Sequence, residues 1–155
     1  MVTRRGTRRP AFEKPILPEI SFQSCPIRAS LGVLGRKWAL LVLRDIGFLK
    51  ETRFRAILRN NTGMTPRILS MRLRDLQRED LIERVVAGKA RSEVSYRLTA
   101  KGRDVLPVLT ALIQYGARHY ASRVFEDGRP RDLDELFPAR QDVMLGRLTA
   151  YAEKK

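Results

Sequence analysis

The chain has 155 residues, 43% of them hydrophobic, and a formal net charge of +14 with a pI near 11.0. This composition excludes a wholly disordered chain, and the apolar runs are shorter than the roughly 18 residues that a membrane span needs. A single cysteine, Cys25, excludes an internal disulfide framework and a cysteine-rich zinc site, so the sequence predicts a cytoplasmic protein with one domain and extensions.

The first 18 residues predict a basic, flexible arm. They carry five basic residues against one acidic residue, and Pro10, Pro15 and Pro18 oppose a helix. Two interpretations stay open, a loose tail and an arm that follows phosphates or enters a minor groove. We expect a division into this arm (1–18), a folded domain (19–122) and a C-terminal helical extension (123–155).

Two helices are expected next. The first begins at Pro26, since proline suits the first helical position, and places Ile27, Leu31 and Leu34 on one face. The second is expected from residue 36 to residue 46, with Gly47 as its C-cap.

A helix-turn-helix pattern follows. A short helix over 52–58 and a turn over 60–63 lead to a strong helix start at Thr65-Pro66. In this second helix the apolar positions repeat at intervals of three and four and predict a core face of Leu69, Leu73 and Leu76. The opposite face carries Arg67, Ser70, Met71, Arg74 and Arg78. Such a division is what reading of a DNA groove requires, because one face anchors the helix while the other offers long hydrogen-bond donors.

Two β-prone runs, 82–86 and 93–98, predict a hairpin with Lys89 and Arg91 at its tip, where they are placed for phosphate or minor-groove contact. The positive charge is concentrated here: residues 50–78 have a net charge of +6, whereas residues 121–155 are neutral. A basic, locally charged surface favours nucleic acid as the partner.

A last long helix is expected after Thr99, with an irregular start at Pro107. Its apolar stripe is longer than a domain of this size needs, so part of it is expected to form a dimer interface. His119 is the only histidine and has no acidic or cysteine cluster near it in sequence, so no metal or other cofactor is expected. We find no glycine-rich phosphate loop and no nucleophile–base pair, and therefore do not expect an enzyme.

The segment from Cys25 to Tyr120 resembles the HxlR-type transcriptional regulators, winged-helix proteins related to the multiple-antibiotic-resistance regulator (MarR) family. The matching motifs are Cys25-Pro26, Gly35-Arg36-Lys37-Trp38, Arg53-Phe54, Pro66-Arg67-Ile68-Leu69, Leu81-Ile82-Glu83-Arg84, Tyr96-Arg97-Leu98-Thr99 and Lys101-Gly102. The resemblance implies a homodimer formed by the N- and C-terminal helices, with two recognition helices in successive major grooves of a two-fold-related operator. Two departures are the absence of the wing prolines common in the family and Tyr115 where it often has tryptophan.

Some relatives sense oxidants or electrophiles through a cysteine near the first helix, and Cys25 matches that position. The alternative is a small buried hydrophobe, because free cysteine is among the most buried residue types.

The sequence thus predicts a mainly α fold with a small β-hairpin wing, a winged helix-turn-helix. The leading hypothesis is a homodimeric, sequence-specific regulator that binds double-stranded DNA through Arg53, Thr65, Arg67, Ser70, Met71, Arg74, Lys89 and Arg91. The alternatives are an architectural DNA-binding protein of low specificity and a winged-helix module for protein interaction.

Overall fold

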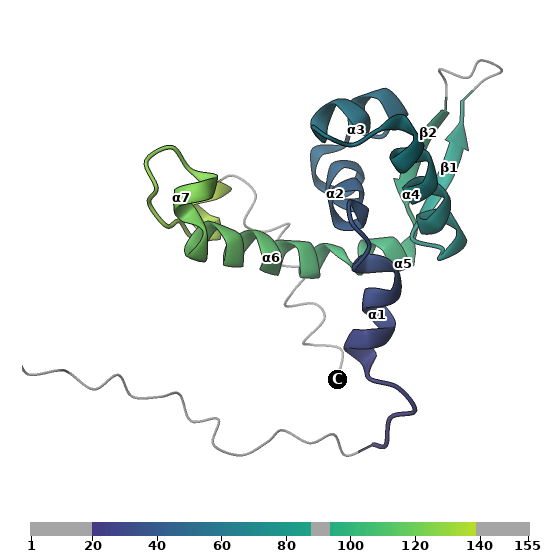
Figure 1. Cartoon of the computed structure of the whole chain (residues 1–155), viewed down its shortest axis with the longest axis horizontal. Helices are drawn as coiled ribbons and strands as arrows, with labels where there is room; N and C mark the ends of the chain where they lie inside the picture. The colour runs from purple at the N-terminus through teal and green to yellow at the C-terminus, as the bar shows by residue number, and fades with distance from the viewer. Residues whose placement is uncertain (1–19, 88–93, 139–155) are drawn as a thin grey trace, which may run out of the picture.

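A computed structural model describes residues 20–87 and 94–138 of the chain (Figure 1). The elements run in the order α1 (Pro26–Leu34), α2 (Ala39–Arg44), a π-helical turn η1 (Asp45–Leu49), α3 (Phe54–Asn60), α4 (Pro66–Arg78), β1 (Ile82–Val86), β2 (Val94–Leu98), α5 (Ala100–Arg103), α6 (Leu106–His119), α7 (Ala121–Val124) and α8 (Leu133–Leu136). The fold is mainly helical with one two-stranded antiparallel hairpin, and the predicted winged helix-turn-helix is confirmed.

The local signals for the helix starts are confirmed. Pro26 opens α1, and Thr65 caps α4 because its hydroxyl oxygen accepts a hydrogen bond from the Ile68 N–H at 3.2 Å. Thr99 caps α5 in the same way, accepting from the Gly102 N–H at 3.0 Å. The expected irregular start at Pro107 is confirmed: the short α5 ends at Arg103, and the long α6 begins at Leu106 with Pro107 in its first turn.

The helix expected over 36–46 is wrong in both of its ends. It begins at Ala39, because Trp38 has a φ of 77° and lies in the left-handed region, which does not continue a helix. It also continues into η1, and Gly47 is not a cap; Lys50 ends the segment with a φ of 58°. Gly47 instead allows a close approach, since a Cβ there would lie 2.5 Å from Leu106 Cδ2.

The hairpin is antiparallel and pairs Ile82 with Leu98 and Val86 with Val94. A further backbone hydrogen bond, from the Tyr96 N–H to the Thr52 carbonyl at 2.8 Å, attaches β2 to the segment before α3. The hairpin is therefore fixed to the helix-turn-helix at its base, while its tip lies outside the described residues.

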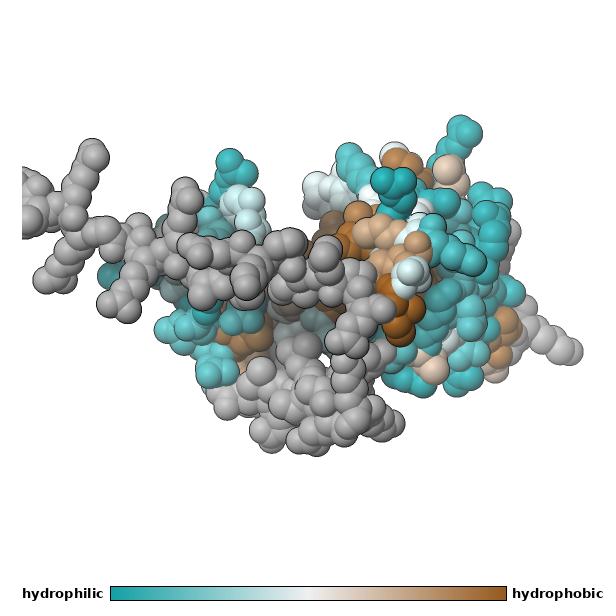
Figure 2. Space-filling model, turned by 90° about the horizontal axis from the view of Figure 1, so that it is seen from below, coloured by the Kyte–Doolittle hydropathy of each residue, from teal (hydrophilic) through white to brown (hydrophobic). Residues whose placement is uncertain are grey.

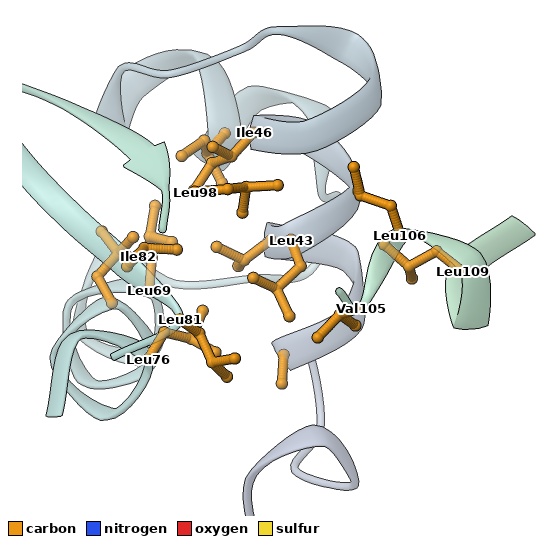
Figure 3. Packing of buried hydrophobic residues seen from close by; sticks show 14 of the residues in the cluster. Leu43, Ile46, Leu69, Leu76, Leu81, Ile82, Leu98, Val105, Leu106 and Leu109 are labelled. Carbon is orange, nitrogen blue, oxygen red and sulfur yellow. The ribbon is translucent and has the colours of Figure 1, made fainter. Parts of the chain in front are cut away.

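One hydrophobic core joins the helix-turn-helix to the hairpin and to the start of α6 (Figure 3). Leu43 from α2, Leu69 and Leu76 from α4 and Ile82 from β1 are each at most 2% exposed. Burial of a leucine or isoleucine side chain contributes about 1.5–3 kcal/mol each. These side chains fix α4 against the rest of the domain.

Two helices project from this core. In the described part of the chain α1 buries none of its residues, and α6 runs away from the core to α7 at its far end (Figure 1). The start of α6 is buried through Leu106 and Leu109, whereas Val108, Leu112 and Tyr115 are about half exposed. The projecting helices therefore carry apolar surface that the other described residues leave exposed.

Candidate nucleic-acid interface

The second helix of the helix-turn-helix, α4, has the two faces that its sequence predicts. Leu69, Leu73 and Leu76 are buried at 2% exposure or less. The other face is solvent-accessible: Arg67, Met71 and Arg74 are exposed and Ser70 is half-buried. A rigidly packed helix thus presents two arginines, a hydroxyl and a thioether to the outside, which are groups that can contact base edges.

The N-terminus of α4 is a position at which an anion such as a phosphate is favoured. Thr65, which is exposed, satisfies one N–H group of the first turn, and Pro66 lacks an N–H. Helix N-termini favour a nearby phosphate because free N–H groups and the helix dipole both point toward it. Arg74 lies about two turns further along the helix, and its Nε donates to the Ser70 carbonyl at 3.3 Å.

Arg72 of the same helix points inward and does not belong to the exposed face. Its Nη1 donates to Asp75 Oδ2 at 2.9 Å, and its side chain is 12% exposed. Arg36, from the connection between α1 and α2, pairs with the same carboxylate oxygen at 2.8 Å. The three-residue spacing of Arg72 and Asp75 could have indicated their pairing, but nothing in the sequence pointed to Arg36.

The first helix of the motif, α3, adds positive charge beside α4. Arg53, at its N-cap, and Arg55 and Arg59 along it are all exposed, as the sequence predicts. Exposed guanidinium groups next to a recognition helix are suited to phosphate oxygens, because they need no directional match to a base.

The wing is described only at its strands. Lys89 and Arg91, the candidate contacts at its tip, lie outside the described residues. On the strands, Arg97 Nε donates to Glu83 Oε1 at 2.6 Å, and this hydrogen bond lowers the pKa of the Glu83 carboxyl. Arg84, opposite Tyr96 on the first strand, is exposed. It is a further cation near the wing, and it is not among the DNA-binding residues that the sequence predicts.

Cys25 is the residue directly before α1, and it is exposed. The interpretation of Cys25 as a small buried hydrophobe is therefore wrong for the single chain. A disulfide would have to form with a second molecule, since the sequence has no other cysteine.

No helix in the described ranges is long and apolar enough to cross a membrane. Within the same ranges, no three side chains of histidine, cysteine, aspartate or glutamate gather where they could hold a metal ion.

Comparisons with known proteins agree with this geometry. An uncharacterized helix-turn-helix transcriptional regulator of Synechocystis sp. is 37% identical over 93 residues, which are 60% of this chain and 68% of that protein. A Porphyromonas gingivalis W83 structure assigned to the MarR family of transcriptional regulators matches with a TM-score of 0.56 and 26% identity, over 66% of this chain and 99% of that one. The redox regulator HypR in its reduced form matches with a TM-score of 0.54 and 27% identity, over 59% and 90% of the two chains.

The HxlR-like helix-turn-helix family matches residues 33–124, which is more than half of the chain and contains the helix-turn-helix, the hairpin and α6. The resemblance on the sequence motifs is thereby confirmed. The chain belongs to the HxlR-like helix-turn-helix family and is a transcriptional regulator of the HxlR/MarR winged-helix type.

Proposed function

We propose that this protein is a homodimeric, sequence-specific regulator that places α4 of each subunit in the major groove of a two-fold-related operator. The observation that carries the proposal is the division of α4 into a face packed in the core and an exposed face with Arg67 and Arg74. In this function residues 19–122 are the DNA-binding domain of a cytoplasmic protein that needs no cofactor and catalyses no reaction.

The candidate residues then take different roles. Arg67 and Arg74 are suited to bidentate hydrogen bonds with guanine, and Met71 to apolar contact with a thymine methyl group. Thr65, the N-cap, precedes them, and Ser70 lies between Arg67 and Met71. The cations outside α4 are assigned to the phosphate backbone: Arg53 on α3, and Lys89 and Arg91 at the wing tip.

The proposed dimer interface consists of the apolar faces of α1 and α6. Ile27 and Leu31 of α1 are 70% and 55% exposed, and Leu112 and Tyr115 of α6 are 48% and 53% exposed. Figure 2 shows hydrophobic side chains gathered at the surface over α1. An exposed apolar surface of this kind is typical of an interface between subunits, and two-fold symmetry would join the same surface of both copies.

Changing Leu31→Glu or Leu112→Glu is expected to convert the dimer into a monomer, because each places a charge in a desolvated interface. The measurement is the molar mass by sedimentation equilibrium. Leu49→Glu is the matched control, since Leu49 is 53% exposed but lies on η1, outside the proposed interface. An unchanged mass for both interface variants would contradict the dimer surface.

Redox sensing by Cys25 is a further part of the proposal. It is supported by the exposure of Cys25 before α1 and by the likeness to HypR, which is named a redox regulator. Hydrogen peroxide would take two electrons from the thiolate: an S–O bond forms as the O–O bond breaks, giving a sulfenic acid on Cys25 and a hydroxide ion.

Treatment with hydrogen peroxide is therefore expected to change the DNA affinity of the wild type and to leave that of Cys25→Ser unchanged. The assay is a titration of labelled DNA before and after the oxidant, with reversal by dithiothreitol. If Cys25→Ser responds to the oxidant as the wild type does, Cys25 is not the sensor.

The experiment that tests the function is binding to the DNA upstream of the protein's own gene and to a scrambled duplex, at two salt concentrations. If the protein is a sequence-specific regulator, it will protect a symmetric site, and this protection will persist at physiological salt. Equal, salt-labile binding to both duplexes would favour the architectural alternative. Absence of binding to either would favour the protein-interaction alternative.

A further inference from the structure

A buried polar network lies between η1 and the turn of the helix-turn-helix. Asp45, the first residue of η1, is fully buried. Its Oδ1 accepts hydrogen bonds from Nε and Nη2 of Arg44, at 2.8 and 2.6 Å. Its Oδ2 accepts from Nδ2 of Asn61, at 2.6 Å. Both carboxylate oxygens are therefore paired, one with the guanidinium group of the preceding residue, Arg44, and one with Asn61 in the α3–α4 turn.

Asn61 is the residue at which α3 stops and the turn to α4 begins. It is 4% exposed, and its Nδ2 also donates to the carbonyl of Ile57, at 2.7 Å. Its main chain takes part in the turn as well, because its N–H donates to the Leu58 carbonyl and its own carbonyl accepts from the Met64 N–H. Thr65, the cap of α4, is the next residue after Met64. One residue, through its side chain and its main chain, thus connects the end of α3, the turn and η1.

The network fixes the position of the α3–α4 turn relative to η1 more strictly than the surrounding core does. Apolar contacts are not directional, so a helix packed by leucines alone can shift slightly at small cost. A buried carboxylate must keep its hydrogen bonds, because an unpaired buried charge is strongly unfavourable. The amide of Asn61 is consequently held at one place relative to Asp45, and the turn that carries α4 is held with it.

We propose that Asp45 and Asn61 are positioning residues for DNA recognition: their buried hydrogen bond fixes the α3–α4 turn and so the placement of α4 in the groove. Neither residue reaches the DNA in this proposal, which rests on the function proposed above. Arg44, whose side chain is 31% exposed, places a positive charge beside the buried carboxylate. Arg67 and Arg74 can then meet bases only while the turn keeps its place.

The test compares two variants that preserve side-chain size, Asp45→Asn and Asn61→Leu. Their preference for the operator over a scrambled duplex is measured at a temperature at which circular dichroism shows a folded protein. We expect a loss of preference of about tenfold or more in both, because each removes a buried hydrogen bond that involves a charge. Val42→Ala is the control, since the fully buried apolar side chain of Val42 cannot form a hydrogen bond and its carbonyl, which accepts from the Asp45 N–H, is kept in alanine; it should keep the wild-type preference.

Amide hydrogen exchange supplies a second measurement that does not depend on an operator. In both variants the Met64 amide, which donates to the Asn61 carbonyl, should exchange faster while the amides of α6 stay protected. If wild-type protein prefers no duplex but this exchange pattern appears, the proposed function fails and the anchoring of the turn stands. If the exchange and the operator preference of a folded Asp45→Asn protein both equal those of the wild type, the positioning role is wrong. Equal loss of protection in the turn and in α6 would also overturn it, because the network would then only support the whole fold.

Discussion

Gly102→Ala is expected to destabilise the domain by about 3 kcal/mol, at the upper end of the range for overpacked sites. Gly102 is buried in α5, and a Cβ added there would lie 1.9 Å from the carbonyl oxygen and 2.9 Å from the carbonyl carbon of Leu81. That carbonyl cannot move freely, because it accepts a hydrogen bond at 3.2 Å from the N–H of Thr99, the cap of α5. The loss is a large part of the roughly 5–15 kcal/mol that stabilises a typical domain.

Urea unfolding followed by circular dichroism measures this effect at one fixed protein concentration. The control is Gly32→Ala in α1, where an added Cβ meets nothing within 4 Å. Alanine is the better helix former, so this variant should unfold at the same urea concentration as the wild type or a higher one. A wild-type midpoint for Gly102→Ala would show that α5 can move away from Leu81 without cost.

The parts of the fold that the sequence predicted correctly depend on neighbours in the chain. The cap at Thr65, the proline at the start of α1 and the core face of α4 are each set by residues within one or two helical turns. The same holds for β1, whose predicted range, 82–86, equals the observed one. The face of α4 that we propose for DNA contact follows from the helical repeat of the apolar positions alone, because it is the side opposite Leu69, Leu73 and Leu76.

The parts that were wrong or missed depend on contacts between distant segments. Glycine often ends a helix, so the sequence predicts a cap at Gly47, but the environment of Gly47 is set by Leu106, far along the chain. In the sequence Asn61 has only the features of an ordinary turn residue, and only the fold brings it to Asp45. The left-handed backbone of Trp38 has no sequence signal, because bulky residues rarely adopt it.

Arg67→Ala and Arg74→Ala are each expected to weaken operator binding by about 1–3 kcal/mol, which is roughly 5- to 150-fold in the dissociation constant. Both side chains are exposed on α4 and neither contributes to the core, so fold stability should change little. The loss should be concentrated on the operator, because a bidentate contact to guanine is lost only where that base is present. Titration of the operator and of a scrambled duplex at the same salt concentration measures the difference.

Arg129→Ala provides the matched control for the loss of one positive charge. Arg129 is exposed in the segment between α7 and α8, and α7 lies at the far end of α6 from α4 (Figure 1). It should lower the affinity for both duplexes slightly and equally, through the net charge alone. If Arg67→Ala and Arg74→Ala also weaken both duplexes equally and each reduces the salt slope by about 1, these arginines bind phosphates and not bases. Base reading would then have to come from other groups, and the placement of α4 in the groove would be the first part of the proposal to revise.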